Sequence, residues 1–186
     1  MDNPRELLEI VFFARGGQGA KSAAEIMAEG AVQEGKFVQA FPSFGPERSG
    51  APTETYLRIS NQEIRTHEPV INPDIIVVLD ETLLKTEKKS ANIWIINSTR
   101  NASELKDKFK LSGEVYSIDA NRISLEIIGA ARPNTVILGK LAKIIKMVKI
   151  ESVVEEFRKI FENKIGKDAC NKNIEAIKKT YDINNQ

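Results

Sequence analysis

The stretch ARGGQGAKS, residues 14–22, brings together residue types that bind phosphate groups. Glycine lets the backbone turn sharply and lets a ligand approach it closely. A helix that starts directly after such a turn points unpaired N–H groups and the positive end of its dipole at the same place. The residues of this candidate phosphate site are Arg15, Gly16, Gly17, Gln18, Gly19, Lys21 and Ser22. The alternative is a tight strand–helix turn that holds no ligand.

The glycine spacing matches neither of two common nucleotide-binding motifs in full. In the dinucleotide pattern G-x-G-x-x-G, Ser22 takes the place of the third glycine. That pattern also needs an acid about 20 residues later to hold a ribose, and FVQAFPSFG contains none. In the triphosphatase loop G-x-x-x-x-G-K-[ST], Lys21 and Ser22 match, but Arg15 and Ala20 replace both glycines. The spacing therefore argues against NAD binding and ATP hydrolysis, but not against a phosphate.

A second cluster, FPSFGPERSGAP at residues 41–52, is rich in proline, glycine and aromatic residues. Prolines restrict the backbone and lower the entropy lost when a loop is fixed. An arginine on such a loop can pair with a carboxylate or a phosphate. The candidate docking residues are Phe44, Gly45, Pro46, Glu47 and Arg48. They could contact a partner protein, line a ligand channel, or form a rigid surface loop.

The composition of the 186 residues excludes several classes of site. The chain has one cysteine, Cys170, and one histidine, His67, so an intrachain disulfide is impossible and a structural zinc site is improbable. An iron–sulfur cluster needs about four thiolates, which this chain cannot supply alone. We expect Cys170 to be a packed residue in a helix rather than a nucleophile. His67 follows no catalytic pattern and is assigned no role.

Charge and hydropathy give no sign of a nucleic-acid or membrane partner. The formal net charge is +1, which is not the strongly basic balance of a nucleic-acid-binding domain. The lysines of the C-terminal segments are interpreted as solvated helix faces. No apolar run approaches the roughly 20 residues of a membrane span, and the N-terminus lacks a signal-peptide pattern. We expect a cytoplasmic protein.

These candidate residues lie on an alternation of strands and helices. Short apolar runs predict strands at residues 9–14, 37–41, 53–60, 63–66, 75–79, 93–96 and 115–118. Helical spacing predicts helices at residues 20–33, 81–89, 102–109, 135–149 and 167–181, and Ser152 with Glu155 forms a capping-box pattern before another. The prediction is a single α/β domain over residues 1–186, with a largely parallel central sheet flanked by helices and a helical C-terminal third.

Both clusters, in this order and spacing, resemble a known family. The resembling segments are ARGGQGAKSAAEIMAEGA, GKFVQAFPSFGPERSGAPTETYLRIS, NPDIIVVLDETLL and PNTVILGKLAKI, which together span residues 10–150. On these segments the chain resembles the gamma subunit of the 2-oxoacid:ferredoxin oxidoreductases, and most closely the pyruvate type. GGQG followed about 25 residues later by FGPERSGAP is far more specific than either glycine motif alone.

The resemblance implies a role inside a larger enzyme. That enzyme converts a 2-oxoacid, coenzyme A and oxidised ferredoxin into acyl-CoA, carbon dioxide and reduced ferredoxin. The resemblance implies alpha, beta and delta partner subunits that carry thiamine diphosphate and iron–sulfur clusters, so this chain would be inactive alone. It implies that the glycine turn binds the phosphates of coenzyme A, and that Phe44–Arg48 contact the catalytic subunits or line the coenzyme A channel.

Several alternatives stay open at this stage. Branched-chain 2-oxoacids or 2-oxoglutarate could replace pyruvate as the substrate. Two alternatives propose a different kind of function. The chain could be a free-standing nucleotide-binding protein, or a purely architectural subunit whose glycine turn binds nothing. The isolated chain could form a homodimer through the surface that its partners would otherwise cover.

Overall fold

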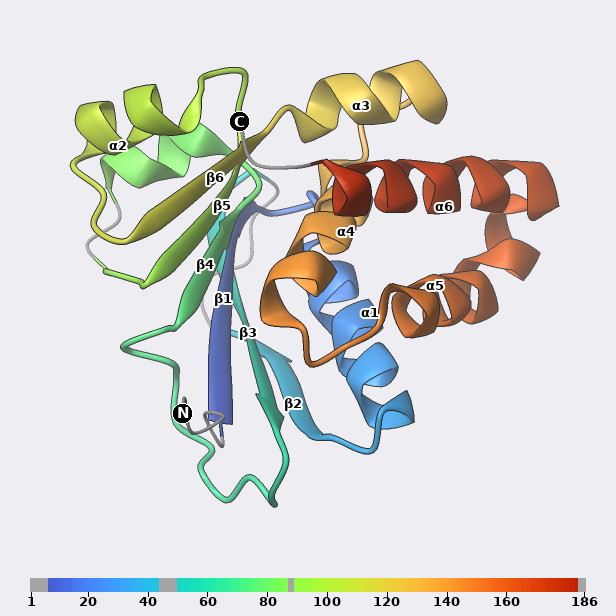
Figure 1. Ribbon diagram of the computed structural model, residues 1–186, viewed down its shortest axis with the longest axis horizontal. Coiled ribbons are helices and arrows are strands. Elements are labelled where there is room, and N and C mark those ends of the chain that lie inside the picture. Colours follow the sequence, from blue (N-terminus) through green and yellow to red (C-terminus); the bar gives the residue numbers. More distant parts are fainter. Residues whose placement is uncertain (1–6, 44–49, 87–88, 184–186) are drawn as a thin grey trace.

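The computed structural model describes residues 7–43, 50–86 and 89–183 of the chain. At its centre lies a six-stranded sheet with the order β2-β3-β1-β4-β5-β6 (Figure 1). The strands are β1 (Leu7–Arg15), β2 (Phe37–Pro42), β3 (Pro52–Ser60), β4 (Ile75–Val78), β5 (Ile93–Asn97) and β6 (Glu114–Ile118). They follow the predicted apolar runs, because a continuous β-branched run such as that of β4 suits a strand buried on both faces.

The sheet is mixed, with most strands pointing the same way. β1 pairs parallel with β4, β4 with β5, and β5 with β6, whereas β3 runs antiparallel between β1 and β2. Because β3 runs against both of its neighbours, all the other strands of the described sheet point in one direction. The prediction of a largely parallel sheet is confirmed.

One predicted strand is wrong. Residues 63–66 form no strand, and irregular backbone runs from residue 61 to β4. Side chains of the sheet hold this segment instead: Gln39 donates to the Ile64 carbonyl at 3.4 Å, and Arg58 donates to the Glu68 carbonyl at 2.7 Å. These contacts replace the expected backbone ladder.

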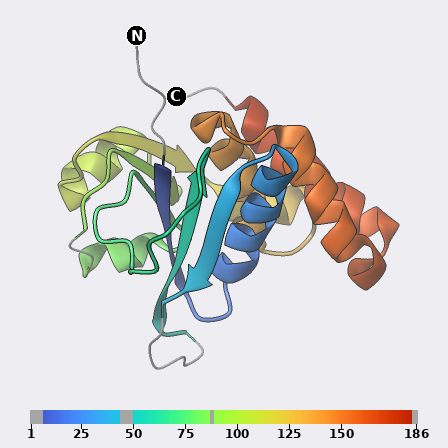
Figure 2. The same cartoon turned by 90° about the horizontal axis from the view of Figure 1, so that it is seen from below.

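Helices cover both faces of the sheet. They are α1 (Ala20–Gln33), the 3-10 helix η1 (Glu81–Lys85), α2 (Ala102–Phe109), α3 (Ala120–Ile127), α4 (Pro133–Ile145), α5 (Ile150–Ile165) and α6 (Lys167–Asp182). Figures 1 and 2 show α1, α4, α5 and α6 on one side of the sheet and α2 on the other. Neighbouring residues of β1 point to opposite faces of the sheet. Phe12 packs in the larger core with α1, and Phe13 packs in the smaller core with η1. The predicted α/β fold with a helical C-terminal third is confirmed.

The C-terminal helices differ in detail from the predictions. The helix expected over residues 135–149 begins at Pro133 and ends at Ile145, because Lys146 adopts a left-handed φ of 53°. The capping box predicted at Ser152 is wrong, since α5 begins at Ile150. The Ser152 hydroxyl donates instead to Glu34 beyond the end of α1, at 2.6 Å. A contact between distant segments thus replaces the local cap.

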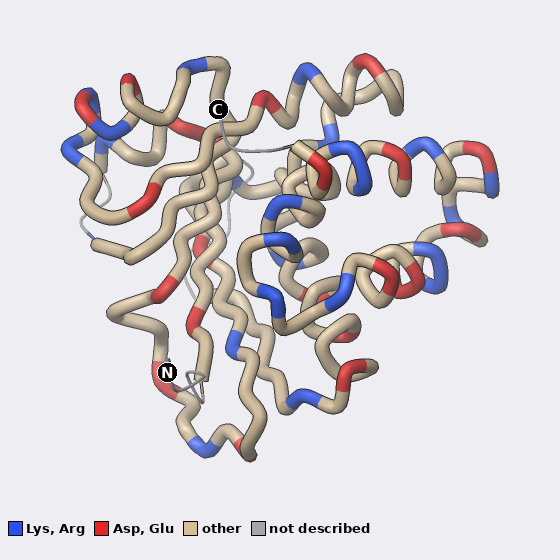
Figure 3. The backbone as a smooth tube through the Cα atoms, viewed as in Figure 1, with Lys and Arg blue, Asp and Glu red and all other residues tan. Residues whose placement is uncertain are grey.

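The charged residues of the described helices are mostly at the surface, but Lys140 on α4 and Glu156 on α5 are buried. Figure 3 shows both signs of charge interspersed along α5 and α6. Lys140 on α4 is only 3% exposed, so the interpretation of every C-terminal lysine as solvated is wrong for this residue. Cys170 is fully buried as expected, and burial raises the pKa of its thiol. None of the helices in the described part of the chain is long and apolar enough to cross a membrane.

Candidate functional site

The glycine turn follows β1, where the connections leaving two neighbouring strands diverge. The chain leaves β1 into α1 on one face of the sheet and leaves β4 into η1 on the other. β1 and β4 are parallel neighbours, so their carboxyl ends meet at the same edge. In open α/β sheets, ligands bind outside the carboxyl ends of the strands at such a point. The fold therefore places the predicted phosphate residues at its preferred ligand position.

The backbone of the turn needs glycine at two positions. Gly17 has a φ of 93° and Gly19 a φ of 79°, a region that residues with a side chain rarely adopt. The Gly16 N–H donates to the Ala51 carbonyl at 2.8 Å, which fixes the turn against the start of β3. The Gln18 side-chain oxygen accepts from the Arg15 N–H at 2.7 Å. Hydrogen bonds within the protein therefore hold the turn in this conformation without the help of a ligand.

Arg15 joins this turn to two other segments. Its guanidinium donates to Asp80 at 2.7 Å, to the Thr82 hydroxyl at 2.7 Å and to the Gly50 carbonyl at 3.1 Å. Partial burial alone would raise the pKa of Asp80, but hydrogen bonds from Thr82 and then Arg15 outweigh it and lower that pKa below its usual value. Arg15 therefore holds the ends of β1 and β4 together, a contact that the sequence did not predict.

Lys21 and Ser22 lie on the first turn of α1. Lys21 is exposed, and its ammonium lies 3.7 Å from a carboxylate oxygen of Glu25. Such a surface ion pair contributes little to the stability of the fold. α1 begins at its N-cap Gly19 without a side-chain cap and without an acidic residue in its first turn. Its first N–H groups and the Lys21 ammonium favour a negative charge beside the turn.

Two hollows flank the turn, and Gly17 and Gly19 border both. The first, the β3-side hollow, has a volume of about 490 Å³ and includes Lys21 and Thr53 in its lining. The second, the α4-side hollow, has a volume of about 400 Å³, and its lining includes Ser22. The remaining walls of the α4-side hollow come from α3, α4, α5 and α6 and from the segment before α4.

The start of α4 contributes a part of the site that sequence reasoning missed. The Asn134 side chain donates to the Gly19 carbonyl at 3.4 Å, and Arg132 and Thr135 line the α4-side hollow beside it. Pro133 occupies the first turn of the helix, which is a recognised start signal. That signal could have placed the helix start, but no local pattern could have placed Asn134 against a residue 115 positions away.

The predicted docking residues Phe44, Gly45, Pro46, Glu47 and Arg48 lie outside the described residues. The described residues on either side of them lie at the site. Ser43 and Gly16 both line the β3-side hollow, and Gly50 donates to the Gly16 carbonyl at 3.2 Å. The prediction for the five residues stays a prediction.

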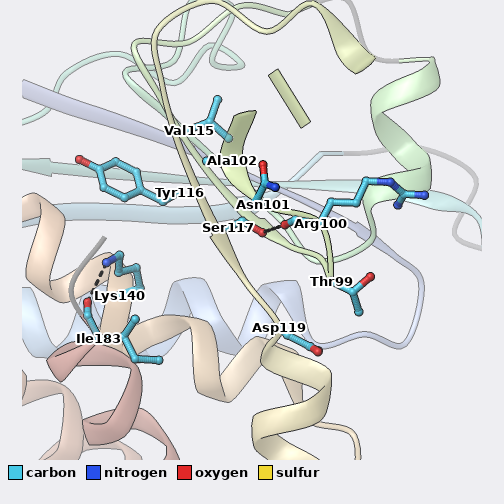
Figure 4. Close-up of a pocket in the computed structure, with 10 residues that line it drawn as sticks. All are labelled: Thr99, Arg100, Asn101, Ala102, Val115, Tyr116, Ser117, Asp119, Lys140 and Ile183. Carbon is cyan, nitrogen blue, oxygen red and sulfur yellow. Dashed lines mark hydrogen bonds between the residues drawn. The ribbon is translucent and has the colours of Figure 1, made fainter. Parts of the chain in front are cut away.

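A third hollow, of about 250 Å³, lies at the other end of the sheet's carboxyl edge, between β6 and α4 (Figure 4). Lys140 points from α4 towards the Ile183 carbonyl, to which it donates at 3.0 Å, and its ammonium lies 5.3 Å from the centre of the Tyr116 ring. Burial, and to a lesser extent the charge of Lys143, lowers the pKa of Lys140. This buried cation is engaged in packing the C-terminal segment against α4.

The described residues include no group of three or more His, Cys, Asp or Glu side chains arranged to hold a metal ion. The first N–H groups of α1 and the Lys21 ammonium beside the glycine turn are suited to an anion instead.

A family model described as pyruvate ferredoxin/flavodoxin oxidoreductase matches residues 9–183. The chain belongs to this family. Among its relatives is the "Pyruvate/ketoisovalerate oxidoreductases common subunit gamma" of Thermococcus kodakarensis, 42% identical over 180 residues, which are 94% of this chain and 97% of the relative. "Pyruvate synthase subunit PorC" of Thermotoga maritima is 36% identical over 182 residues, 96% of this chain and 95% of the relative. The resemblance drawn from the motifs is confirmed, and the chain is a gamma-type subunit of a 2-oxoacid:ferredoxin oxidoreductase.

Solved structures share the fold. The crystal structure of the pyruvate oxidoreductase subunit PORC from Thermotoga maritima matches with a TM-score of 0.82 at 35% identity, over 95% of this chain and 96% of that one. A 2-oxoglutarate:ferredoxin oxidoreductase from Magnetococcus marinus, with 2-oxoglutarate, coenzyme A and succinyl-CoA bound, matches with a TM-score of 0.76 at 20% identity. That match covers 95% of this chain and 30% of the larger protein, and it shows a shared fold.

Proposed function

We propose that this gamma-type subunit binds the phosphates of coenzyme A at the glycine turn and helps to hold the catalytic subunits in place. The reaction of the complex would be the oxidation of pyruvate with coenzyme A and ferredoxin, giving acyl-CoA and carbon dioxide. The names of the relatives from Thermococcus kodakarensis and Thermotoga maritima support pyruvate as the substrate. The first of these names also includes ketoisovalerate, so a branched-chain 2-oxoacid is the alternative.

The observation that carries the proposal is the position of the turn. Gly16–Gly19 follow β1 where the connections of β1 and β4 diverge, and they lead into a helix whose first turn has no acid and no side-chain cap. Coenzyme A brings a diphosphate and a 3′-phosphate to such a place. Coenzyme A is also bound in the Magnetococcus marinus enzyme, which shares this fold.

The other chemistry of the reaction would belong to partner subunits. Thiamine diphosphate for the decarboxylation and iron–sulfur clusters for electron transfer to ferredoxin are assigned to alpha, beta and delta subunits. The part of this chain would then be to bind coenzyme A and position it, which affects KM more than the chemical step.

The test is a Lys21→Ala variant assayed in the intact complex. Lys21 is the better choice than Arg15, because Arg15 also holds Asp80 and Gly50 and its loss would disturb the turn itself. We expect a KM for coenzyme A that is several-fold higher, with a nearly unchanged kcat. Lys106→Ala, which removes another exposed lysine on α2 at the opposite face of the sheet, is the matched control and should leave KM unchanged. An unchanged KM in Lys21→Ala would favour the architectural subunit.

The assembly role has its own test. The tagged chain, purified gently and without oxygen from its own host, should bring down partner polypeptides with the visible absorption of iron–sulfur clusters. That preparation should oxidise pyruvate only when coenzyme A is present. If the chain emerges colourless and alone, the assembly proposal fails, and binding of a free nucleotide becomes the question.

A further inference from the structure

We propose that a hollow lined by Lys36, Lys146 and Lys149, here called the amino-edge hollow, binds an acidic segment of a partner polypeptide. The hollow has a volume of about 440 Å³ and lies where β1 and β2 begin and β3 ends. The glycine turn follows β1 and so lies at the opposite edge of the sheet. This inference rests on the proposed assembly role and is independent of coenzyme A binding.

The lining of the amino-edge hollow carries more positive than negative charge. Its described residues include the three lysines and one acid, Glu34, which leaves a net charge of +2. The Lys149 ammonium lies 3.1 Å from a Glu34 carboxylate oxygen, so these two charges balance each other. The Lys36 ammonium donates to the neutral Asn61 side chain at 2.7 Å and keeps its charge. Within the described chain, the Lys146 ammonium has neither an ion pair nor a hydrogen bond. The hollow therefore favours an anionic group.

Glu34 fixes one wall of the hollow. It directly follows α1, and its carboxylate accepts from the Ser152 hydroxyl of α5 at 2.6 Å. This hydrogen bond, followed by the contacts with Lys149, lowers the pKa of Glu34, so its carboxylate is ionised at neutral pH. The end of α1 and the start of α5 are thereby held to each other. The hollow is thus a preformed part of the fold, which lowers the cost of binding a partner.

Apolar side chains lie within and beside the hollow. Leu8 and Met147 line it, and both are half-buried against the larger core. Val32 and Phe37, which stand on either side of the turn from α1 into β2, are each 49% exposed. Protein interfaces combine an apolar centre with charges at the rim, whereas a small anion needs no such apolar area. The combination of lysines and apolar side chains therefore favours a polypeptide over a small anion.

The family of the chain gives a reason for such a partner. A gamma-type subunit works within a complex of several polypeptides, so part of its surface is covered there. The connection from α4 to α5, residues 146–149, reads KMVK and has no acid, and Figure 3 shows it marked by basic residues. By contrast, α5 and α6 carry both signs of charge. Lysines at the rim of an interface attract acidic surfaces and select against basic ones. The expected partner segment therefore carries Asp or Glu side chains beside an apolar one.

Lys146 has a backbone conformation that is unusual for a lysine. It ends α4 with a left-handed φ of 53°, where glycine is the usual residue. Lys110 ends α2 with the same φ of 53° and supplies a matched control. Replacing either lysine by glycine relieves backbone strain but removes a positive charge. These two variants therefore distinguish the loss of a partner from the loss of stability.

The experiment compares the partner polypeptides that copurify with tagged natural and variant chains from the native host, without oxygen. Lys36→Glu combined with Lys146→Glu should lower their recovery about tenfold or more, because two attractive contacts become repulsive. Lys106→Glu combined with Lys110→Glu makes the same change of charge on α2 and should leave recovery within about twofold.

The glycine variants exclude unfolding as the cause. Lys146→Gly should unfold at a temperature no lower than that of the natural chain, and yet recover about threefold less of the partners. Lys110→Gly should also unfold no earlier than the natural chain and should recover the natural amount. The KM for coenzyme A in the complex that still forms with Lys146→Gly should be unchanged, because the hollow lies away from the glycine turn.

A carbodiimide, which joins an amine directly to a carboxylate, gives a second measurement on the intact natural complex. It should link Lys36, Lys146 or Lys149 to an Asp or Glu of a partner polypeptide, as identified by mass spectrometry. The Lys149–Glu34 pair within the chain is the internal positive control. Links from these lysines that stay within the chain, or that join two copies of it, would overturn the inference.

The remaining outcomes separate this inference from the proposed function. If the natural chain recovers no partners, the assembly role fails and this inference fails with it. If the natural chain and the variant with Lys36→Glu and Lys146→Glu recover the same amount, this inference alone fails. Unchanged recovery together with a melting temperature that inorganic phosphate raises only in the natural chain would make the hollow a small-anion site. That result would also contradict the inference.

Discussion

The Asn134 side chain lies against Gly19 so closely that a Cβ built on Gly19 would stand 2.5 Å from the Asn134 amide nitrogen. Asn134 also donates to the Gly19 carbonyl at 3.4 Å. Two residues far apart in the chain thus join the start of α1 to the start of α4. The glycine turn is therefore positioned by both helices, not only by the strand that precedes it.

Gly19→Ala should destabilise the protein more than Gly17→Ala. Both glycines have a positive φ, which costs a residue with a side chain roughly 1–2 kcal/mol. Only at Gly19 does the added methyl group also meet Asn134, since no heavy atom of the described chain lies within 4 Å of a Cβ on Gly17. Chemical denaturation of the two variants should show a lower free energy of unfolding for Gly19→Ala by a further ~1 kcal/mol.

A double variant distinguishes the cost of the positive φ at Gly19 from the cost of the steric contact with Asn134. Asn134→Ala combined with Gly19→Ala should recover the extra loss, because the shorter side chain leaves room for the methyl group. Equal stabilities of Gly17→Ala and Gly19→Ala would show that the contact between the starts of α1 and α4 is looser than the structure indicates.

A second close approach holds the C-terminal helices together. A Cβ on Gly139 of α4 would overlap the Ile177 carbonyl oxygen and the Thr180 hydroxyl of α6, and the Thr180 hydroxyl bonds the Val136 carbonyl at 2.5 Å. The obstacle is backbone, which cannot rotate away. Gly139→Ala should therefore lower the free energy of unfolding by about 2–4 kcal/mol, although alanine is the better helix former.

Gly30→Ala is the matched control for that variant. Gly30 also lies inside a helix, α1, but a Cβ there would be 3.2 Å from a methyl group of Val148, which a small shift can relieve. Thermal unfolding should rank Gly139→Ala well below Gly30→Ala. The opposite ranking would mean that α6 does not pack on α4 at this glycine.

The elements that the sequence predicted correctly are those with local signals, whereas contacts between distant segments were not predicted. α1 was predicted over Ala20–Gln33 with both ends in place, because its apolar spacing and the glycine that follows it are local signals. The buried strands were recognised for the same reason. Helix α3 was not predicted, although α2, which has the same length, was predicted with both ends in place.

The errors concern residues whose local pattern is overridden by a distant partner. Ser152 has the spacing of a capping box, but its hydroxyl bonds Glu34. Lys140 reads as a surface lysine, but α6 and the Ile183 carbonyl bury it. At the candidate site, the glycine turn was predicted from its local pattern, but the position of Asn134 and the role of Arg15 were not, because their hydrogen-bond partners lie on other elements.

The contact between Arg15 and Asp80 should make stability depend on pH. Hydrogen bonds from Thr82 and Arg15 lower the pKa of Asp80 in the folded protein, despite the opposing effect of burial. A carboxylate with a lowered pKa stabilises the fold above its unfolded pKa, and that contribution is lost as the pH falls through the folded pKa. Asp80→Asn should therefore cost about 1–2 kcal/mol at about pH 7, and the difference from the natural protein should shrink below about pH 4.

Thermal unfolding at several pH values measures this difference. Asp107→Asn, which neutralises an exposed carboxylate on α2, is the matched control and should stay within about 0.5 kcal/mol of the natural protein. In the complex, Asp80→Asn should also raise the KM for coenzyme A. Arg15 would lose its ion pair with Asp80, and that pair helps to hold the glycine turn in place. A stability difference that stayed constant between about pH 7 and about pH 3 would show that the ionised Asp80 carboxylate is not what Arg15 binds.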